Sequence, residues 1–312
     1  MKGSALSVII PTKDRLSILG ESVEAALKAT AHLQVEIIIV NDSLKKDIGI
    51  TIKNENIKCI QNQGSGVAAA RNTGAKEAEG ELLLFLDDDI LISRENIDTT
   101  LRLCSELPLA CVNLNWAYPP QLLEKIKKSK FGRYLIRIGF TTMKGWNRGN
   151  KWDDTKLFET ENVASFYLPV LKKDFIAVGG YNEKFPFAGA EDYDFSMRLK
   201  RSGFRTLIYP LSTVLHNEND RTEISAWLER KKRSAETRKV AVDLGYTELA
   251  LSHSKLKMIL YRTFGFTKPL LKLMAAFIPN HRFFDPIYAL CIGRLLGIYL
   301  FDGYHKMKKE PK

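Results

Sequence analysis

The first 115 residues alternate between short apolar segments rich in β-branched residues and longer segments with helical periodicity. Apolar runs of roughly four to eight residues without polar positions are typical of strands buried on both faces. Alternation of such strands with helices favours a mainly parallel sheet that helices cover on both faces. The expected strands are 6–11, 35–40, 57–60, 82–86 and 109–114, and the expected helices are 16–27, 66–78 and 93–105.

The pattern that follows is less regular. Residues 116–160 are expected to be irregular and mixed, with a basic amphipathic stretch at Leu122–Ile138. The elements expected beyond it are a strand over 162–170, a helix over 191–201, a strand over 206–209 with a short loop leading to His216, and a long charged helix over 224–244.

The distribution of charge divides the chain into two regions. The formal net charge is +11, and residues 221–312 hold 18 Lys and Arg against 8 Asp and Glu, so the first 220 residues are nearly neutral. We therefore expect an α/β catalytic region at 1–220 and a basic helical region at 221–312. A basic region favours an anionic partner, either nucleic acid or an anionic lipid surface. The sequence has no helix-turn-helix or RNP-like pattern, which disfavours nucleic acid.

Cysteine spacing and the lengths of apolar runs indicate in which cellular compartment the protein is expected. The four cysteines form no CxxC pair, which favours a reducing environment. The apolar run near the N-terminus stops at Pro11, so no signal peptide is expected. The longest apolar candidates, 269–279 and 286–301, are interrupted by Lys272 and Arg294. Since a membrane-spanning helix needs about 18 apolar residues, we expect none, and we expect the protein in the cytoplasm.

Acidic side chains gather at the ends of the expected strands. Asp14 and Asp42 each follow a strand, and Asp87, Asp88 and Asp89 follow the fully apolar strand 82–86. In parallel sheets, ligands bind beyond the carboxyl ends of the strands. Three consecutive carboxylates repel one another unless a cation neutralises them, and Mg²⁺ or Mn²⁺ would also bind substrate phosphates. A solvated acidic loop is the alternative explanation.

A second acidic cluster opens the helix expected at 191–201. Glu191 and Asp192 at a helix N-terminus are favoured by the helix dipole, so capping explains them as well as a catalytic carboxylate does. Arg198 lies one turn after Asp194 and could pair with it. His216 could be a structural histidine, or its imidazole could complete a metal site begun by Asp89.

The glycine-rich segment Gly64-Ser65-Gly66 offers a competing interpretation. It follows an expected strand and opens a helix, with acids about 20 residues further on, which imitates a dinucleotide-binding fingerprint. That fingerprint needs one acid for a ribose diol, whereas three are present here. A dinucleotide-dependent oxidoreductase and a nucleotidyltransferase therefore remain alternative functions.

Six segments in this order resemble the family 2 glycosyltransferases, which have the GT-A fold. They are SVIIPTKDR (7–15), IIIVNDS (37–43), GVAAARNTGAKEAEGELLLFLDDD (66–89), FIAVGGYNEKF (175–185), GAEDYDFSMRLKRSG (189–203) and VLH (214–216). The resemblance spans about residues 5–217. It implies the fold of a nucleotide-diphospho-sugar transferase, with a mixed, mainly parallel sheet flanked by helices, and the chain adds a C-terminal helical extension.

The resemblance also implies a role for each matching residue. Asp192 would be the general base, with Glu191 beside it to raise its basicity or bind acceptor hydroxyls, and Asp89 would bind Mn²⁺ or Mg²⁺ with help from His216. Asp88 would support these groups or exchange roles with Asp87. Nucleotide-sugar contacts are implied for Pro11, Thr12 and Asp14 in the pocket, Asp42 at the base, Arg71 at the nucleotide and Asp87 near the ribose.

The same resemblance implies inversion at the anomeric carbon in a single displacement. Processive members carry a QxxRW-like motif and several membrane spans, and neither is evident here, which favours transfer of one sugar or few. UDP is the expected nucleotide, with dTDP and GDP as alternatives.

The basic C-terminal region is predicted to contain amphipathic helices. One apolar face is expected from Leu256, Ile259, Leu260, Thr263 and Phe264, and another from Leu290, Leu295 and Ile298, both with basic flanks. Such helices suit a membrane interface, which would place a lipid-linked or envelope acceptor at the cytoplasmic face of the membrane. Packing on the catalytic region, or pairing of two copies through these helices, is the alternative.

Overall fold

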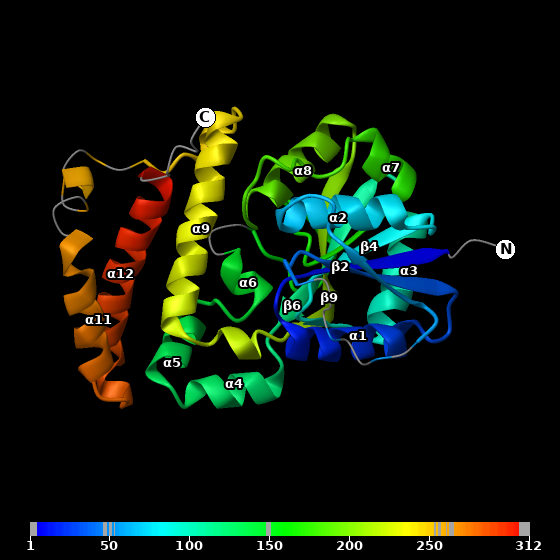
Figure 1. The fold of residues 1–312 in the computed structure, drawn as a ribbon. Helices are drawn as coiled ribbons and strands as arrows, with labels where there is room; N and C mark the ends of the chain where they lie inside the picture. Colours follow the sequence, from blue (N-terminus) through cyan, green and yellow to red (C-terminus); the bar gives the residue numbers. More distant parts are fainter. Residues whose placement is uncertain are drawn as a thin grey trace. The chain divides into compact units, whose positions relative to one another are not determined.

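The computed structural model describes residues 5–45, 49, 52, 54–147, 151–252, 254, 257–259, 261 and 265–305 (Figure 1). The chain forms two compact units. The first consists of Met1–Pro119, Thr142–Pro186 and Glu191–Glu218, and the second of Pro120–Thr141, Phe187–Ala190 and Asn219–Lys312. The second unit thus includes two segments that lie within the region expected to be catalytic.

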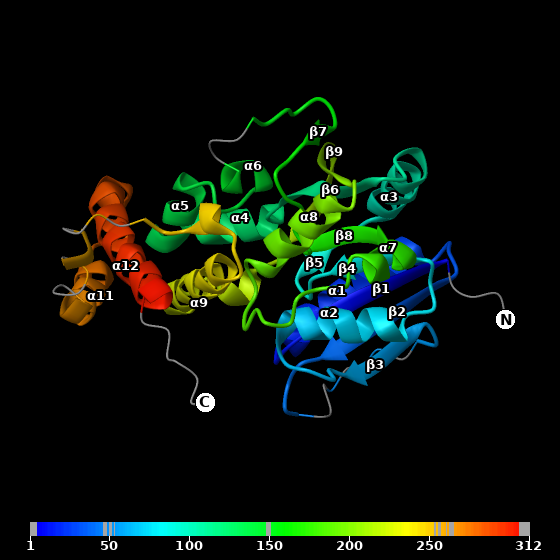
Figure 2. The same ribbon diagram turned by 90° about the horizontal axis from the view of Figure 1, so that it is seen from above.

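A five-stranded sheet forms the base of the first unit, in the order β3-β2-β1-β4-β8 (Figure 2). The pairs β1–β2, β1–β4 and β2–β3 are parallel, and β8 is antiparallel to β4. These five strands are β1 (Leu6–Thr12), β2 (Val35–Asn41), β3 (Ile57–Gln61), β4 (Leu82–Leu86) and β8 (Tyr167–Leu171). The predicted mainly parallel α/β sheet is confirmed, whereas the strand expected at 162–170 begins only at Tyr167.

Helices cover both faces of this sheet, with α2 on one face and α1 on the other (Figure 1). The apolar residues of α1 recur at helical spacing and are buried, which explains why this segment packs on the strands. The helices of the first unit are α1 (Leu16–Thr30), α2 (Gly66–Glu77), α3 (Arg94–Glu106), α6 (Met143–Trp146), α7 (Lys172–Ala177) and α8 (Glu191–Arg201).

A second, smaller sheet contains β5 (Ile90–Leu91), β6 (Ala110–Ala117), β7 (Phe158–Glu159) and β9 (Arg205–His216). The prediction of a loop between residue 209 and His216 is wrong, because β9 continues to His216. Leu114 pairs with Tyr209 but Asn115 pairs with Thr213, so residues 210–212 bulge out of the ladder with β6. Pro210 has no N–H to donate, which makes this position suited to a bulge rather than to regular pairing.

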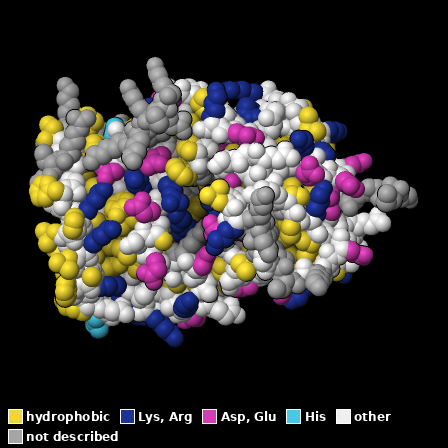
Figure 3. Space-filling model, in the orientation of Figure 1, with side chains coloured by type: hydrophobic (Ala, Val, Ile, Leu, Met, Phe, Trp, Pro, Cys, Tyr) yellow, Lys and Arg dark blue, Asp and Glu magenta, His cyan; other side chains and the backbone are white. Residues whose placement is uncertain are grey.

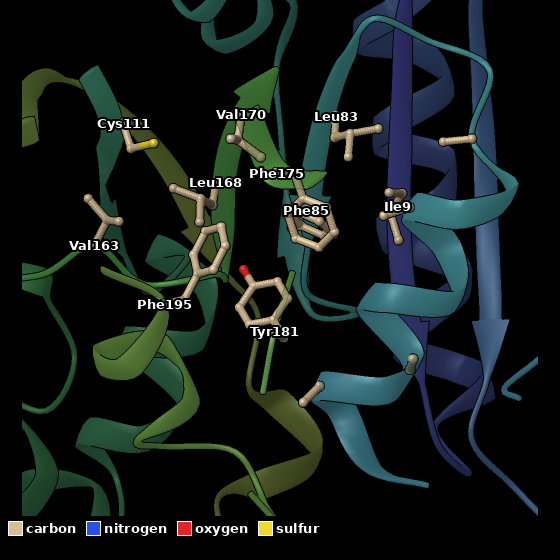
Figure 4. Packing of buried hydrophobic residues seen from close by; sticks show 14 of the residues in the cluster. Ile9, Leu83, Phe85, Cys111, Val163, Leu168, Val170, Phe175, Tyr181 and Phe195 are labelled. Atoms are coloured by element: carbon tan, nitrogen blue, oxygen red, sulfur yellow. The ribbon is translucent and has the colours of Figure 1, made fainter. Parts of the chain in front are cut away.

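Aromatic rings join α7 and α8 to the centre of the first sheet (Figure 4). The ring of Phe85 on β4 lies 5.1 Å from that of Phe175 and 5.3 Å from that of Tyr181. Tyr181 in turn stacks on Phe195 of α8 at 4.6 Å. Rings at these distances add to the burial of their apolar surface. The start of α8 is thereby fixed relative to the end of β4.

The second unit has an apolar core of its own. Trp227 is surrounded by the rings of Phe131, Tyr134 and Phe140, at centroid distances of 5.7, 5.9 and 5.9 Å. The helices of this unit are α4 (Pro120–Lys127), α5 (Lys130–Arg137), α9 (Ile224–Asp243), α11 (Lys268–Phe277) and α12 (Asp285–His305), with 3-10 turns η1 (Asn219–Arg221), η2 (Thr247–Leu249), η3 (Gly265–Thr267) and η4 (Arg282–Phe284). Residues 116–160 are thus more regular than expected, because α4, α5 and α6 lie there.

The expected apolar faces of the C-terminal region are corrected in part. Leu290 is exposed, but Leu295 and Ile298 are buried in the second unit. Five residues along a helix correspond to a rotation of about 140°, so Leu290 and Leu295 do not share a face. Of the other expected face, Ile259 is exposed, and the remaining positions, Leu256, Leu260, Thr263 and Phe264, lie outside the described residues.

One helix in the described part of the chain, Arg282–His305, is long and apolar enough to cross a membrane. This differs from the expectation of no such segment, because α12 extends beyond residue 301 and carries few charges. A third of its most apolar window is buried inside the protein.

Gly74 of α2 is a sensitive position for stability. A Cβ at Gly74 would lie 2.4 Å from Cγ2 of the buried Ile9 and 3.1 Å from Cγ2 of Val40. Gly74→Ala should therefore lower the free energy of unfolding by about 1–3 kcal/mol, because overpacking outweighs the gain in helix propensity. Gly20→Ala in α1 is the matched control, since nothing lies within 4 Å of its Cβ, and it should stabilise by about 0.5–1 kcal/mol. Urea unfolding measures both, and equal shifts would contradict this packing.

Candidate active site

The carboxyl ends of β1, β2 and β4 bring the predicted strand-end residues together. The N–H of Asp42 donates to the carbonyl of Thr12 at 2.8 Å. The hydroxyl of Thr12 donates to Asp88 across the sheet at 2.8 Å. Asp14 is exposed in a left-handed conformation, with φ 55°, and accepts a bond from Ser43 Oγ at 2.7 Å. Pro11 is buried within β1, opposite Val40 of β2.

Asp42 fixes the glycine-rich segment rather than leaving it open to a ligand. Its Oδ1 accepts from the N–H of Gly66 at 2.9 Å and from Nδ2 of Asn62 at 2.7 Å. Its Oδ2 lies 3.2 Å from Nζ of Lys13. Because the N–H of Gly66 donates to a carboxylate, it is not directed at a diphosphate as a dinucleotide fingerprint requires. This geometry disfavours the dinucleotide interpretation.

Asp87, Asp88 and Asp89 each meet a positively charged group. Asp87, the most exposed of the three, accepts from Nη2 of Arg71 at 2.9 Å. Asp88 is buried and pairs with Arg15, and Asp89 Oδ2 lies 2.9 Å from Nη1 of the same Arg15. Two guanidinium groups thus offset the mutual repulsion of three carboxylates. The sequence motif contains Arg15, but no role was expected for it.

His216 lies beside Asp89 because β5 and β9 are antiparallel partners. His216 pairs with Ile90, and the N–H of Asn217 donates to the carbonyl of Asp89 at 2.7 Å. Nε2 of His216 then lies 3.3 Å from Oδ1 of Asp89. The strand pairing therefore brings together two residues that are 127 positions apart in the sequence.

Asp89, His216 and Glu218 form a group that fits a divalent cation. Their ligand atoms all lie within 4.8 Å of one another, and all three residues are buried. Nδ1 of His216 is buried and has no hydrogen-bond partner among the described residues. One imidazole nitrogen and two carboxylates form a donor set that suits Mn²⁺ or Mg²⁺.

Glu218 was not expected as a site residue. Its spacing of two from His216 was the available signal, because alternate residues of an extended chain point to the same side. The hydroxyl of Tyr118 donates to Glu218, and Trp116 packs edge-on against His216 at 5.0 Å. Burial alone would lower the pKa of His216, but the charges of Asp89 and Glu218 outweigh it and raise that pKa. The surroundings of His216 thus favour positive charge.

Arg71 links the acidic end of β4 to the start of α8. Its Nη1 lies 3.1 Å from Glu191 Oε1 and 3.7 Å from Asp192 Oδ1, while Nη2 contacts Asp87. The guanidinium also lies over the ring of Tyr181 at 5.2 Å. Burial alone would lower the pKa of Arg71, but these carboxylates outweigh it and raise the pKa. The side chain is only 3% exposed and faces carboxylates rather than an open surface.

Asp192 is the more accessible of the two acids at the start of α8. Its side chain is 17% exposed, whereas that of Glu191 is 1% exposed. The hydroxyl of Ser165 donates to Oδ1 of Asp192, and the N–H of Ser165 donates to Oδ2 at 3.2 Å. Burial raises the pKa of Asp192, and Arg71 and these hydrogen bonds oppose the rise without cancelling it. No sequence pattern indicated Ser165.

The charge of Asp87 acts on both the group of Asp89, His216 and Glu218 and the acidic start of α8. This charge raises the pKa of both Asp192 and His216. Further along α8, the expected pair forms, with Nη2 of Arg198 2.7 Å from Oδ2 of Asp194. The residues expected at the site therefore lie at one region of the first unit.

Comparison with known proteins identifies the family. A sequence model of glycosyl transferase family 2 matches residues 7–163, which is half of the chain. The chain belongs to glycosyltransferase family 2. A second model, described as the N-terminal domain of galactosyltransferase, matches residues 162–219.

Individual relatives agree with this assignment. An uncharacterized glycosyltransferase of Haemophilus influenzae is 26% identical over 197 residues, which cover 62% of this chain and 61% of that protein. The O-antigen biosynthesis protein RfbC of Myxococcus xanthus is 24% identical over 226 residues, or 69% of this chain and 17% of that protein. The chain therefore spans between about a sixth and three fifths of the length of these relatives.

A solved structure shares the fold. The mannosyltransferase PcManGT from Pyrobaculum calidifontis, in complex with GDP-Man and Mn²⁺, superposes with a TM-score of 0.55 at 11% identity. The match covers 99% of this chain and 89% of that one. The expected GT-A fold with a C-terminal helical extension is confirmed for this member of the family.

Metal binding tests the group of Asp89, His216 and Glu218. We expect Asp89→Asn and His216→Ala each to weaken Mn²⁺ binding by about 100-fold, because loss of an expected ligand should cost at least as much as loss of a group that only supports one. Electron paramagnetic resonance of free Mn²⁺, with and without UDP, measures the uptake. The matched control is His32→Ala, since His32 Nε2 and Asp98 form another His–Asp pair at 2.8 Å. Equal loss in the control, or no uptake by the unchanged protein, would contradict the site.

Proposed function

We propose that this chain is an inverting, metal-dependent glycosyltransferase that moves a single sugar from a nucleoside-diphosphate sugar to a hydroxyl of a glycan or lipid-linked acceptor. The observation that carries the proposal is the electrostatic link between two clusters of acidic residues. Asp87 pairs with Arg71, and its charge raises the pKa of a residue in each cluster. One group has the donor set for a divalent cation. The other contains Asp192, whose pKa is raised by burial and whose side chain is 17% exposed.

The donor would bind at the ends of β1, β2 and β4. Thr12, Asp14 and Asp42 lie there and would line the nucleotide pocket together with the backbone at Pro11. Asp87, the most exposed of its cluster, would accept bonds from the ribose, and Asp88 would keep Arg15 and Thr12 in place behind it. UDP is the first nucleotide to test, followed by dTDP and by GDP, since the Pyrobaculum mannosyltransferase was solved with GDP-Man.

Asp89, His216 and Glu218 would hold Mn²⁺ or Mg²⁺, which when bound neutralises charge on the departing diphosphate. In the reaction, the acceptor oxygen would form a bond to the anomeric carbon as the bond from that carbon to the diphosphate oxygen breaks. The acceptor proton would pass to Asp192. Attack opposite the leaving group inverts the configuration.

Asp192 is suited to the role of base by its surroundings. A carboxylate with a raised pKa takes up a proton more readily than an ordinary one. Arg71 shares its positive charge among Asp87, Glu191 and Asp192, so Asp192 is held in place without being fully neutralised. We therefore propose that Arg71 and Glu191 act by positioning and tuning Asp192. This differs from the direct nucleotide contact first expected for Arg71.

The acceptor is proposed to be a glycan of the cell envelope, assembled at the cytoplasmic face of the membrane. The Myxococcus relative is named for O-antigen biosynthesis, which supports this class of acceptor. The basic, apolar C-terminal region supports peripheral attachment to an anionic membrane. Pairing of two copies through these helices is the competing use of that region.

A screen of nucleotide sugars with Mn²⁺ tests the function. We expect release of a nucleoside diphosphate, most rapidly from one UDP-sugar, while binding of NAD is not expected. Asp192→Asn should lower the transfer rate by about 10²–10⁴-fold, because it removes the proton acceptor. Calorimetry should show that this variant still binds UDP with Mn²⁺.

The control for this experiment is Asp153→Asn, which changes a partly exposed acid of the first unit that contacts Thr155 and should leave transfer unchanged. Release of pyrophosphate from a nucleoside triphosphate would instead indicate a nucleotidyltransferase. A loss of UDP binding equal to the loss of rate would count against Asp192 as the base.

The pH dependence of transfer tests the link between Ser165 and Asp192. A base acts when deprotonated, so kcat/KM should fall as pH drops through the pKa of Asp192. The hydrogen bond from the Ser165 hydroxyl lowers that pKa. Ser165→Ala removes this bond, so it should raise the pKa and move the acidic limb of the profile to higher pH. Tyr181→Phe is the matched control, since its hydroxyl contacts Ser165 Oγ but not Asp192. An unchanged limb in Ser165→Ala would refute the link.

A further inference from the structure

Exposed apolar side chains are concentrated in one part of the second unit. Nine of the seventeen exposed large apolar side chains among the described residues lie between residues 259 and 290. Seven of these nine belong to the hairpin of α11, η4 and α12: Leu270, Leu273, Met274, Phe277, Phe283, Ile287 and Leu290. Figure 3 shows hydrophobic side chains gathered over these two helices. Apolar patches of this kind mark surfaces that meet a partner or a membrane.

The exposed side chains of α11 form one face of that helix. Leu270, Leu273, Met274 and Phe277 recur at spacings of three and four, which places them on a single stripe. On α12, Ile287 and Leu290 continue the same spacing to Arg294, which is also exposed. The exposed apolar positions of α12 are therefore followed on the same face by a basic residue. We refer to the exposed apolar residues of α11, η4 and α12 together as the apolar stripe.

The hairpin is firmly held within its own unit. Nζ of Lys130 donates to the carbonyls of Ala275 and Ala276 at the end of α11, at 2.7 and 2.8 Å. Arg133 makes two bonds of 2.7 Å to Asp285 at the start of α12. Both ends of the turn between the helices are thus anchored to α5. The apolar stripe is consequently part of a packed element and not of a frayed terminus.

The charges around the stripe favour an anionic partner. Between residues 265 and 305 the chain has four Lys or Arg and two acids. Both acids are ion-paired, Asp285 with Arg133 and Asp302 with Lys268. Lys272, Arg282 and Arg294 are exposed. In a symmetric pair of copies the same basic border would face itself, and the like charges would repel.

We propose that the α11–α12 hairpin docks on an anionic lipid surface, with Phe277 and Phe283 entering the boundary between headgroups and acyl chains. The hairpin would lie on the membrane rather than cross it, because Ile292, Leu295 and Ile298 of α12 are buried in the unit's core. Basic residues bordering an apolar stripe add attraction to anionic lipids. The proposal rests on the membrane location proposed above and names the segment responsible.

Vesicle flotation tests the proposal without any donor or acceptor present. The probes are vesicles of phosphatidylcholine alone and vesicles with roughly 30% phosphatidylglycerol. We expect the full chain to float with the anionic vesicles. The triple change Leu273→Gln, Phe277→Gln and Phe283→Gln should weaken this binding by about tenfold or more, because three apolar side chains no longer leave water.

The matched control changes three exposed apolar residues of the first unit, Leu109→Gln, Ile176→Gln and Leu211→Gln, which are 60%, 63% and 55% exposed. This control should float like the unchanged chain. Neutralising Lys272, Arg282 and Arg294 to Gln provides a second variant that leaves the apolar stripe intact, and it should weaken binding to the anionic vesicles only.

Equal flotation of the hairpin variants and the unchanged chain would overturn the proposal. So would a dimer, detected by light scattering, that the triple hairpin variant dissociates while neither protein floats; the stripe would then be a contact between copies. Nucleotide-sugar hydrolysis in solution separates the two proposals, because the hairpin variants should retain it. A chain that floats but hydrolyses no nucleotide sugar would refute the proposed function and leave the docking surface in place.

Discussion

The buried guanidinium of Arg71 connects the two halves of the candidate site. It contacts Asp87 after β4 and both Glu191 and Asp192 at the start of α8. A charge without partners in this position would be costly, and so would three carboxylates without the guanidinium; breaking such a buried network costs about 3–5 kcal/mol. The sheet, α2 and α8 therefore depend on one another, since each supplies a member of the cluster. The rings of Phe85, Tyr181 and Phe195 form the apolar support of the same junction.

The balance of charge explains why a cation suits the other half of the site. Asp88 and Asp89 share Arg15, so one guanidinium serves two carboxylates, and Glu218 adds a further negative charge near His216. The two oxygens of Asp89 have different partners: Oδ2 faces Arg15 and Oδ1 faces His216. Arg15 thereby orients Asp89 so that one oxygen remains directed toward the histidine. A divalent cation at that point would be attracted by the carboxylates of Asp89 and Glu218.

Much of this arrangement could be predicted from the sequence, and the reason lies in strand register. Thr12 ends β1, and Asp42 and Asp87 directly follow β2 and β4. Parallel strands end at the same edge of a sheet, so the proximity of these residues is implied by the strand pattern alone. Ser165 could not be found in this way, because its bond to Asp192 joins a loop to a helix across 27 residues without a recurring spacing. The continuation of β9 was also missed, because Pro210 and the bulge after Tyr209 interrupt the alternation that identifies a strand. The prediction for α12 was wrong in placing Leu290 and Leu295 on one face, because five residues of helix put them on different faces.

Two of the proposed site residues, Asp192 and Glu218, lie close to positions where the chain passes from one unit to the other. The second unit includes Phe187–Ala190, which directly precedes Glu191 and Asp192, and it resumes at Asn219, directly after Glu218. The proposed base and one proposed metal ligand thus lie where the chain enters and leaves the first unit. Each is nevertheless fixed by a hydroxyl of the first unit, Asp192 by Ser165 and Glu218 by Tyr118. Both anchors belong to the first unit, so the proposed base and this proposed metal ligand are each held by a hydrogen bond within that unit. The hairpin proposed to meet the membrane belongs to the second unit.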